Sequence, residues 1–185
     1  MNLIEHVERY LGPIEAGARL REGVQGAWFR ERPFAGSSSF MTLGLSHHVF
    51  KQAAGNGIRL ELLIACRNEF VESFNPLSIL ADVSDRVAST HVAPARGTVI
   101  GPAGRFSPQF QMEALYCCSP VYFDDGFAEY GGFSEPLVII WLVPITPEEA
   151  LYVQESGWDA FEDLLESAEP DLLDLERPSL VESDA

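Results

Sequence analysis

The chain has 185 residues, of which 46% are hydrophobic and 22% are charged. This composition is typical of a single globular domain and excludes an intrinsically disordered chain. With 28 acidic and 12 basic residues the formal charge is -16, which excludes a nucleic-acid-binding protein and a protein that binds anionic membranes, since both need a basic surface.

The first predicted element is an amphipathic helix over residues 3–11. Its apolar side chains recur at helical spacing on one face, and Asn2 precedes it as a cap. Gly12-Pro13 ends the helix. A loop rich in Gly and Glu is expected to follow.

Three strands are predicted next, at residues 24–29, 40–45 and 58–66. Gly36-Ser37-Ser38 is expected to break the strand structure between the first two strands. In the third strand, one face carries Ile58, Leu60, Leu62 and Ile64, and the other carries Arg59, Glu61 and Leu63. A period of two over this length is typical of a strand that is buried on one face only.

A helix is predicted to begin at Asn75-Pro76, because Asn caps helices and Pro is tolerated at the first helical position. Its buried stripe is expected to be Leu80, Val83 and Val87. Residues 92–112 contain three Pro and three Gly, so a loop is predicted there, with one short strand at 98–100.

Two further strands, at residues 113–119 and 137–143, flank a Gly-rich acidic loop at 124–134. The second strand is almost wholly apolar, so we expect it at the centre of the sheet, buried on both faces. It is also the longest apolar run, and it falls far short of the about 20 residues that a membrane-spanning helix needs. The N-terminus has neither the basic flank nor the apolar core of a signal peptide. We therefore expect a cytoplasmic protein.

The C-terminal part is predicted to hold two consecutive helices. Thr146-Pro147-Glu148-Glu149 has the pattern of a capping box, and this helix is expected to end near Ser156-Gly157. The second helix ends at Pro170. Its inward face is expected to carry Trp158, Phe161, Leu164, Leu165 and Ala168, and its outward face Asp159, Glu162, Asp163 and Glu166.

The order of the elements predicts an α+β fold, because strands precede helices without regular alternation. We expect a mixed, largely antiparallel sheet with helices packed on it. Residues 1–181 are predicted to form a single domain, and residues 182–185 a disordered acidic tail. Cys66, Cys117 and Cys118 are odd in number and two are adjacent, so we expect buried structural thiols and no disulfide framework.

The negative charge is concentrated at the C-terminal end. Residues 146–185 carry 13 acids and one base, Arg177, so this segment contributes -12 of the net -16. Such a segment can be a solvated surface that keeps the chain soluble and a monomer or weak dimer, or a docking face for a basic protein partner. For the second case, we expect part of the steering face to consist of Glu148, Glu155, Asp159, Glu162, Asp163 and Glu166.

No catalytic, metal or cofactor motif stands out. Gly44-Leu45-Ser46-His47-His48 lacks the second glycine of a nucleophile elbow, and the histidines and cysteines lack zinc-ligand spacing. Asp124, Asp125 and Glu129 do not follow the ligand order of a calcium loop, and the glycine-rich stretches match neither a P-loop nor a dinucleotide fingerprint. We expect no catalytic residue, metal or cofactor.

Other interpretations remain open at this point. The aromatic residues clustered at 116–133 can cover a small core or form a recognition surface. An enzyme would need a site formed in space, for which His47, Glu61 and Asp124 are the candidates. A structural subunit of an assembly would show a large exposed apolar patch.

Three stretches taken in order resemble the suppressor-of-fused domain family, in its compact single-domain bacterial form. They are Thr42-Leu43-Gly44-Leu45-Ser46, Gly57-Ile58-Arg59-Leu60-Glu61-Leu62, and the region from Val138 through Thr146-Pro147-Glu148-Glu149 to Arg177-Pro178-Ser179. The similarity runs from about residue 25 to residue 181, and it is weakest over residues 92–135. The resemblance implies a non-enzymatic protein-binding domain, and for the bacterial members an immunity protein that neutralises a toxin domain by binding it.

Overall fold

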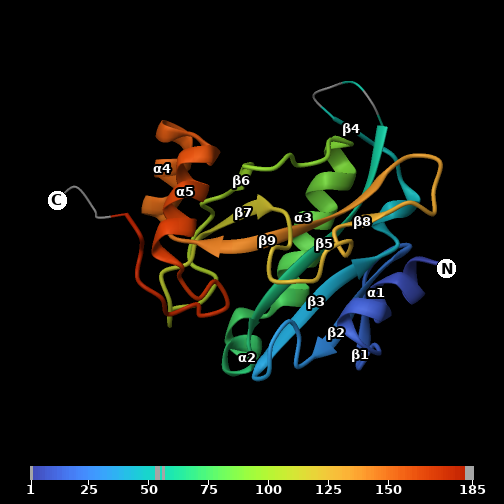
Figure 1. The fold of residues 1–185 in the computed structure, drawn as a ribbon, viewed down its shortest axis with the longest axis horizontal. Coiled ribbons are helices and arrows are strands. Elements are labelled where there is room, and N and C mark those ends of the chain that lie inside the picture. Colours follow the sequence, from blue (N-terminus) through green and yellow to red (C-terminus); the bar gives the residue numbers. More distant parts are fainter. Residues whose placement is uncertain (1, 53–54, 56, 182–185) are drawn as a thin grey trace.

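The structure is a computed structural model that describes residues 2–52, 55 and 57–181. Within these residues the strands form one sheet with the order β1-β2-β3-β5-β9-β7-β6 (Figure 1). Its members are β1 (Ala16–Arg21), β2 (Val24–Arg30), β3 (Ser37–Leu43), β5 (Gly57–Arg67), β9 (Leu137–Ile145), β7 (Ala114–Cys118) and β6 (Val99–Ile100). Two short strands lie off this path, β4 (Phe50–Lys51) beside β5 and β8 (Glu129–Tyr130) beside β9.

The sheet is mixed, because β5 and β9 run parallel while the other named pairs are antiparallel. The chain leaves β5, passes through helices on one face and returns through β7 before it enters β9. The observed class is α+β, as predicted. The almost wholly apolar strand predicted at 137–143 lies between β5 and β7, where it is buried on both faces.

Five α-helices pack on this sheet within the described residues: α1 (Leu3–Leu11), α2 (Val71–Phe74), α3 (Pro76–Thr90), α4 (Pro147–Ser156) and α5 (Trp158–Ala168). Two short 3-10 helices, η1 (Leu45–His47) and η2 (Asn68–Phe70), lie in the connections. One face of the sheet is covered by α2 and α3. The other is covered by α1 near β2 and by α4 and α5 at the opposite end, with residues 119–133 between them (Figure 1).

The helix starts follow the predicted capping residues. Asn2 and Glu5 form a capping box at α1, and Thr146 and Glu149 form one at α4. The side chain of Asn75 accepts a hydrogen bond from the Ser78 amide at the start of α3. These contacts satisfy amides that a helix leaves unpaired at its first turn. The two consecutive C-terminal helices are thereby confirmed.

Two predictions in the first half of the sheet were wrong. Ser37-Ser38 does not break the strand structure but begins β3, where Ser37, Ser38 and Ser39 are all buried. Their hydroxyls donate to Phe34 O, Asn68 Oδ1 and Arg32 O, so burial leaves none of them without a partner. The Gly-rich segment after α1 was expected to be a loop but contains the edge strand β1, which pairs with β2.

Strand β5 is buried on both faces, although alternation predicted burial on one. Leu60 and Leu62 belong to the core under α3, while Leu63 and Ala65 belong to the core on the opposite face. Glu61 lies on that opposite face and is fully buried. Apolar and polar residues do alternate along β5, but the side chain of Glu61 is hydrogen-bonded within the protein rather than solvated.

The inward face of α5 differs from the predicted one. Phe161 is buried as expected, but Trp158 is 43% exposed and Ala168 is exposed. Trp158 lies in the first turn of α5, against Gly97 and beneath the Arg96 guanidinium, which is 4.8 Å from the ring centroid. Gly97 has a φ of 85° and lacks the space for a Cβ atom next to Trp158, so glycine is required there. The predicted tail, residues 182–185, lies outside the described residues.

Candidate protein-binding surface

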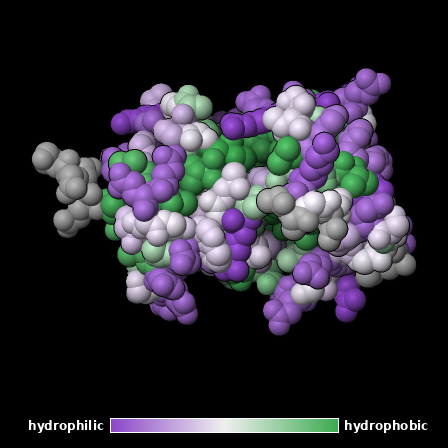
Figure 2. Space-filling model, turned by 90° about the horizontal axis from the view of Figure 1, so that it is seen from above, coloured by the Kyte–Doolittle hydropathy of each residue, from purple (hydrophilic) through white to green (hydrophobic). Residues whose placement is uncertain are grey.

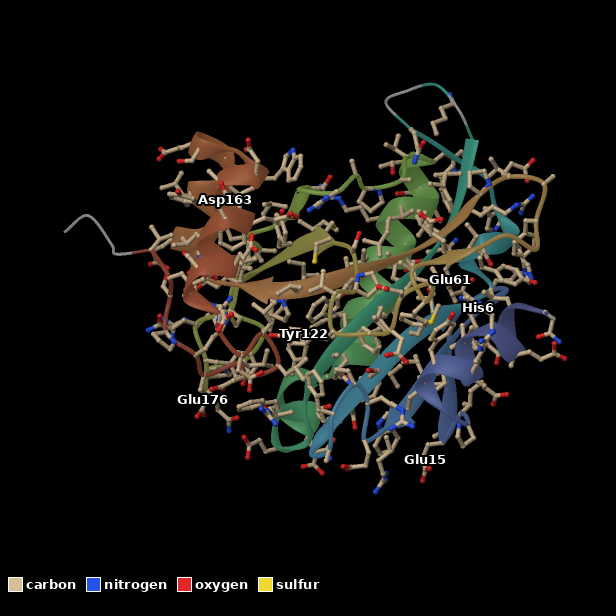
Figure 3. All side chains as sticks on the ribbon, viewed as in Figure 1. His6, Glu15, Glu61, Tyr122, Asp163 and Glu176 are labelled. Carbon is tan, nitrogen blue, oxygen red and sulfur yellow. The ribbon has the colours of Figure 1, made fainter. Side chains whose placement is uncertain are left out.

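The predicted steering residues all lie on α4 and α5, at one end of the molecule (Figure 3). Glu155, Asp159, Asp163 and Glu166 are exposed. Glu148 and Glu162 are only partly exposed. We call these six residues the acidic face. Four of them are therefore open to a partner, and two also take part in contacts within the protein.

Glu162 is held by two neighbouring groups. The hydroxyl of Tyr116 donates to its Oε1 at 2.8 Å, and Arg96 Nε donates to the same atom at 2.9 Å. Arg96 Nη2 completes a two-point ion pair with Oε2. Burial tends to raise the pKa of Glu162, but Arg96 and Tyr116 outweigh it, so the pKa of this carboxyl is lowered. Glu162 thus ties α5 to β7 and to the segment before β6.

A groove with a volume of about 540 Å³ runs beside α5. It is lined by Arg96, Tyr116, Cys118, Ser119, Val121, Tyr122, Glu162, Leu165, Glu166, Glu169, Pro170 and Leu172. We call it the α5 groove. Its apolar walls come from α5, from the segment after β7 and from the segment that follows α5. Seen from above, Figure 2 shows apolar surface between the end of the molecule that holds α4 and α5 and the rest of the molecule, with hydrophilic side chains on either side.

The groove was not predicted from the sequence, and neither Val121 nor Glu169 was singled out. One signal was present. Glu169 follows the last residue of α5 and precedes Pro170, and the last turn of that helix carries no basic residue. An acidic side chain at this end of a helix is unfavourable without a cation nearby.

The aromatic residues between 116 and 133 cover the second core. Tyr116 and Phe127 are fully buried, and the ring of Tyr122 lies 5.1 Å from that of Trp141. The Tyr122 hydroxyl donates to Pro170 O and accepts from the amide of Leu172, so it fastens residues 170–172 to the sheet face (Figure 3). Most of these rings therefore form core structure, and Tyr122 also lines the α5 groove.

The buried carboxylate of Glu61 is fully engaged by its own neighbourhood. Its Oε1 accepts hydrogen bonds from the Gly44 and Ser46 amides and from the Ser46 hydroxyl, and its Oε2 accepts one from Thr42. Burial raises the pKa of Glu61 against the opposing effect of these donors. The four contacts fix the turn from β3 into η1.

The residues proposed for an enzymatic site form no hydrogen-bonded group in the described part of the chain. Glu61 is buried, whereas the side chains of His47 and Asp124 are exposed. Among the residues that the structure describes, no hydrogen bond or ion pair joins any two of the three. The only role the structure gives Glu61 is that of holding the turn.

The three cysteines are buried or partly buried free thiols. Burial raises the pKa of Cys66 and of Cys117 to about 12, and it raises the pKa of Cys118 as well, so all three are protonated thiols at neutral pH. Within the described part of the chain, no group of three His, Cys, Asp or Glu side chains is arranged to hold a metal ion. No helix there has the length and apolar character to span a membrane.

Comparison with known proteins gives a consistent result. The family model described as suppressor of fused protein (SUFU) matches residues 21–178. The immunity protein YqcF of Bacillus subtilis (strain 168) is 23% identical over 155 residues, which cover 82% of this chain and 78% of that protein.

The fold is also found in solved structures. A putative SUFU homolog from Neisseria gonorrhoeae FA 1090 is 18% identical, with a TM-score of 0.71 over 97% of this chain and 94% of that one. A chain of the Sufu-Fu complex is 12% identical, with a TM-score of 0.73 over 96% of this chain and 90% of that one. Drosophila Suppressor of Fused aligns with a TM-score of 0.64 and 12% identity over 84% of this chain, which spans 42% of that longer chain.

Proposed function

Because the chain belongs to the suppressor of fused family, we propose that it is a protein-binding domain that acts as an immunity protein, neutralising a basic toxin domain by binding it. The relative that carries the name of an immunity protein supports the biological role. The structure of the Sufu-Fu complex supports a protein partner for this fold. We further propose that residues 1–181 act as one binding unit in the cytoplasm.

The observation that carries this proposal is the charge of the C-terminal end. Residues 146–185 hold 13 acids, and their one base, Arg177, is buried in an ion pair with Glu149. Arg177 therefore adds little to the surface potential of this end. A concentrated negative field attracts a basic protein over several ångströms and accelerates its association. The same field opposes self-association, so we propose a monomer or a weak dimer.

The four exposed members of the acidic face supply the steering charge in this proposal. Glu155, Asp159 and Asp163 lie outside the lining of the α5 groove, whereas Glu166 belongs to it. Glu162 contributes less to the field, because Arg96 neutralises it. The acidic face would thus guide the partner towards the groove, where apolar surface is available for contact.

Titration of a toxin domain with the purified chain tests this function. A basic toxin domain encoded in the source genome is assayed for activity at increasing amounts of the chain. A binding protein inhibits in direct proportion to its amount and reaches full inhibition at an equimolar ratio. Full and lasting inactivation by a small fraction of an equivalent would indicate an enzyme that modifies the toxin, and the proposal would then be wrong.

A further inference from the structure

The α5 groove combines an apolar interior with an open mouth. Leu165 and Leu172 line its walls, and Val121 at its mouth is 69% exposed. Its volume of about 540 Å³ is within the range of roughly 300–1,000 Å³ that is usual for ligand pockets. Covering exposed apolar surface inside a concave site with an apolar group is energetically favourable. The groove is therefore suited to receive a side chain with a long hydrocarbon portion.

The charges at the groove are unbalanced. Arg96 is the only base among the lining residues, and it is already paired with Glu162. Within the described residues, no ion pair or side-chain hydrogen bond engages the carboxylates of Glu166 or Glu169. Both belong to the end of α5, whose last turn carries no base and whose final carbonyl groups add further negative potential. The net charge at the mouth of the groove is therefore negative.

Glu169 is unfavourable at its position for two independent reasons. It is the C-cap of α5, with a φ of 46° and a ψ of 48°, a left-handed conformation that favours Gly or Asn over other residues. In addition, its negative charge lies at the negative end of a helix. A cation bound beside Glu169 would relieve the second cost. Glu169 therefore lowers the stability of the fold, but it adds a negative charge to the α5 groove.

We propose that the α5 groove seats an arginine side chain of the partner protein. In this arrangement the methylene groups lie against Val121, Leu165 and Leu172, and the guanidinium group binds the carboxylates of Glu166 and Glu169. Arginine fits better than lysine, because its planar cation offers several donors to two carboxylates and is less strongly hydrated. This inference rests on the proposed function, since it assigns a contact point to the basic partner.

The groove and the acidic face have separate tasks in this scheme. Exposed charges mainly set the rate of association, whereas a side chain that is buried on binding mainly sets the rate of dissociation. A single arginine anchor in a pocket is the kind of contact that dominates the affinity of an interface. The groove thus provides the specific part of recognition, and the acidic face provides the attraction.

A small probe tests the groove without the toxin. N-acetyl-arginine amide is titrated into the 15N-labelled full chain at low ionic strength, with N-acetyl-citrulline amide, its uncharged isostere, as the matched ligand. We expect saturable shifts of the amide resonances of Val121, Leu165 and Glu169. The dissociation constant should lie in the millimolar range, which is usual for a ligand of this size. The citrulline compound is expected to bind at least about tenfold more weakly, because it lacks the cation.

Two double variants separate the site from the general charge. The Glu166→Gln/Glu169→Gln variant should lose most of the binding, whereas Glu72→Gln/Glu176→Gln, with the same change of net charge at exposed positions outside the groove, should retain it. Equal binding of the two probes, unsaturable shifts spread over α4 and α5, or equal loss in both variants would overturn the groove assignment. Because no toxin is used, these results do not depend on the toxin titration, which tests the function alone.

Discussion

Arg177 and Glu149 form a two-point ion pair that is almost entirely excluded from solvent. Arg177 Nη1 donates to Glu149 Oε1 at 2.6 Å and Nη2 donates to Oε2 at 2.9 Å, and the two side chains are 4% and 0% exposed. Glu149 also caps α4 by accepting from the Thr146 amide. The pair therefore fastens the C-terminal segment to the start of α4.

Removing one partner of this pair should destabilise the fold strongly. We expect Arg177→Met and Glu149→Gln each to lower the free energy of unfolding by about 3–5 kcal/mol, because a buried charged or polar group then lacks its partner. The double variant should cost much less than the sum, and urea denaturation measures all three. As a control, Arg67→Met removes a half-exposed pair with Asp171 and should cost less than about 1 kcal/mol. Additive effects would mean that the two residues do not act as a unit.

Glu61→Gln is expected to be well tolerated, because the amide oxygen can keep the contacts of Oε1 and the amide nitrogen can donate to Thr42. Glu61→Ala leaves buried donors of Gly44 and Ser46 without an acceptor, and each unpaired donor costs about 1–3 kcal/mol. Thermal unfolding at pH 5 distinguishes the two variants. Equal losses of stability would show that the hydrogen bonds of Glu61 do not hold this turn.

The same substitution has a pH dependence of definite sign. Burial raises the pKa of Glu61 above the ordinary value of 4.5, so the folded protein holds this proton more tightly than the unfolded chain. Its contribution is therefore complete below pH 4.5 and is lost as the pH rises through the folded pKa. The stability of Glu61→Gln relative to the natural chain should increase as the pH is raised above 4.5. A relative stability that falls over this range would contradict the direction of the shift.

Glu169→Gly is expected to stabilise the protein while weakening recognition. Glycine accepts the φ of 46° at the end of α5 without strain and removes a charge from the negative end of the helix. We expect a gain of about 1 kcal/mol in the free energy of unfolding, measured by urea denaturation, and weaker binding of N-acetyl-arginine amide. A Gly variant that is less stable than the natural chain would show that Glu169 makes a stabilising contact in the fold.

Trp158→Ala should cost only about 1 kcal/mol, because the half-exposed ring chiefly loses a cation–π contact with Arg96. Phe161→Ala, three residues further along α5, should cost about 3–5 kcal/mol, since Phe161 is fully buried. The melting temperatures of the two variants provide the comparison. A larger loss of stability for Trp158→Ala than for Phe161→Ala would indicate that Trp158 is buried, as the sequence pattern predicted.

Local signals in the sequence predicted the helix starts and the central strand well. The caps of α1, α3 and α4 need only residues within one turn of each other. The burial of Ser38 and Glu61 was missed, because their partners Asn68 and Thr42 lie 30 and 19 residues away. Burial of a polar side chain depends on such partners, which periodicity does not reveal.

The candidate surface was predicted only in part. The concentration of acids on two consecutive helices was visible in the sequence, and four of the six predicted residues are exposed, whereas Glu148 and Glu162 are only partly exposed. The groove was not visible, because Val121, Leu165 and Leu172 come from three separate segments. Trp158 was misplaced because Gly97 and Arg96, which lie before β6, decide how the first turn of α5 packs.

The rate of association with a basic toxin domain, measured by stopped flow over a range of ionic strength, shows whether the acidic face steers a basic partner. We expect the natural chain to associate faster as salt is lowered, and Glu155→Lys/Asp159→Lys/Asp163→Lys to be slower by about tenfold or more at low salt, with the two converging at high salt. The variant Glu22→Lys/Glu69→Lys/Glu72→Lys has the same net charge, with its changes at exposed positions outside residues 146–185, and should be slowed much less. Equal rates for the natural chain and the first variant at low salt would contradict the account.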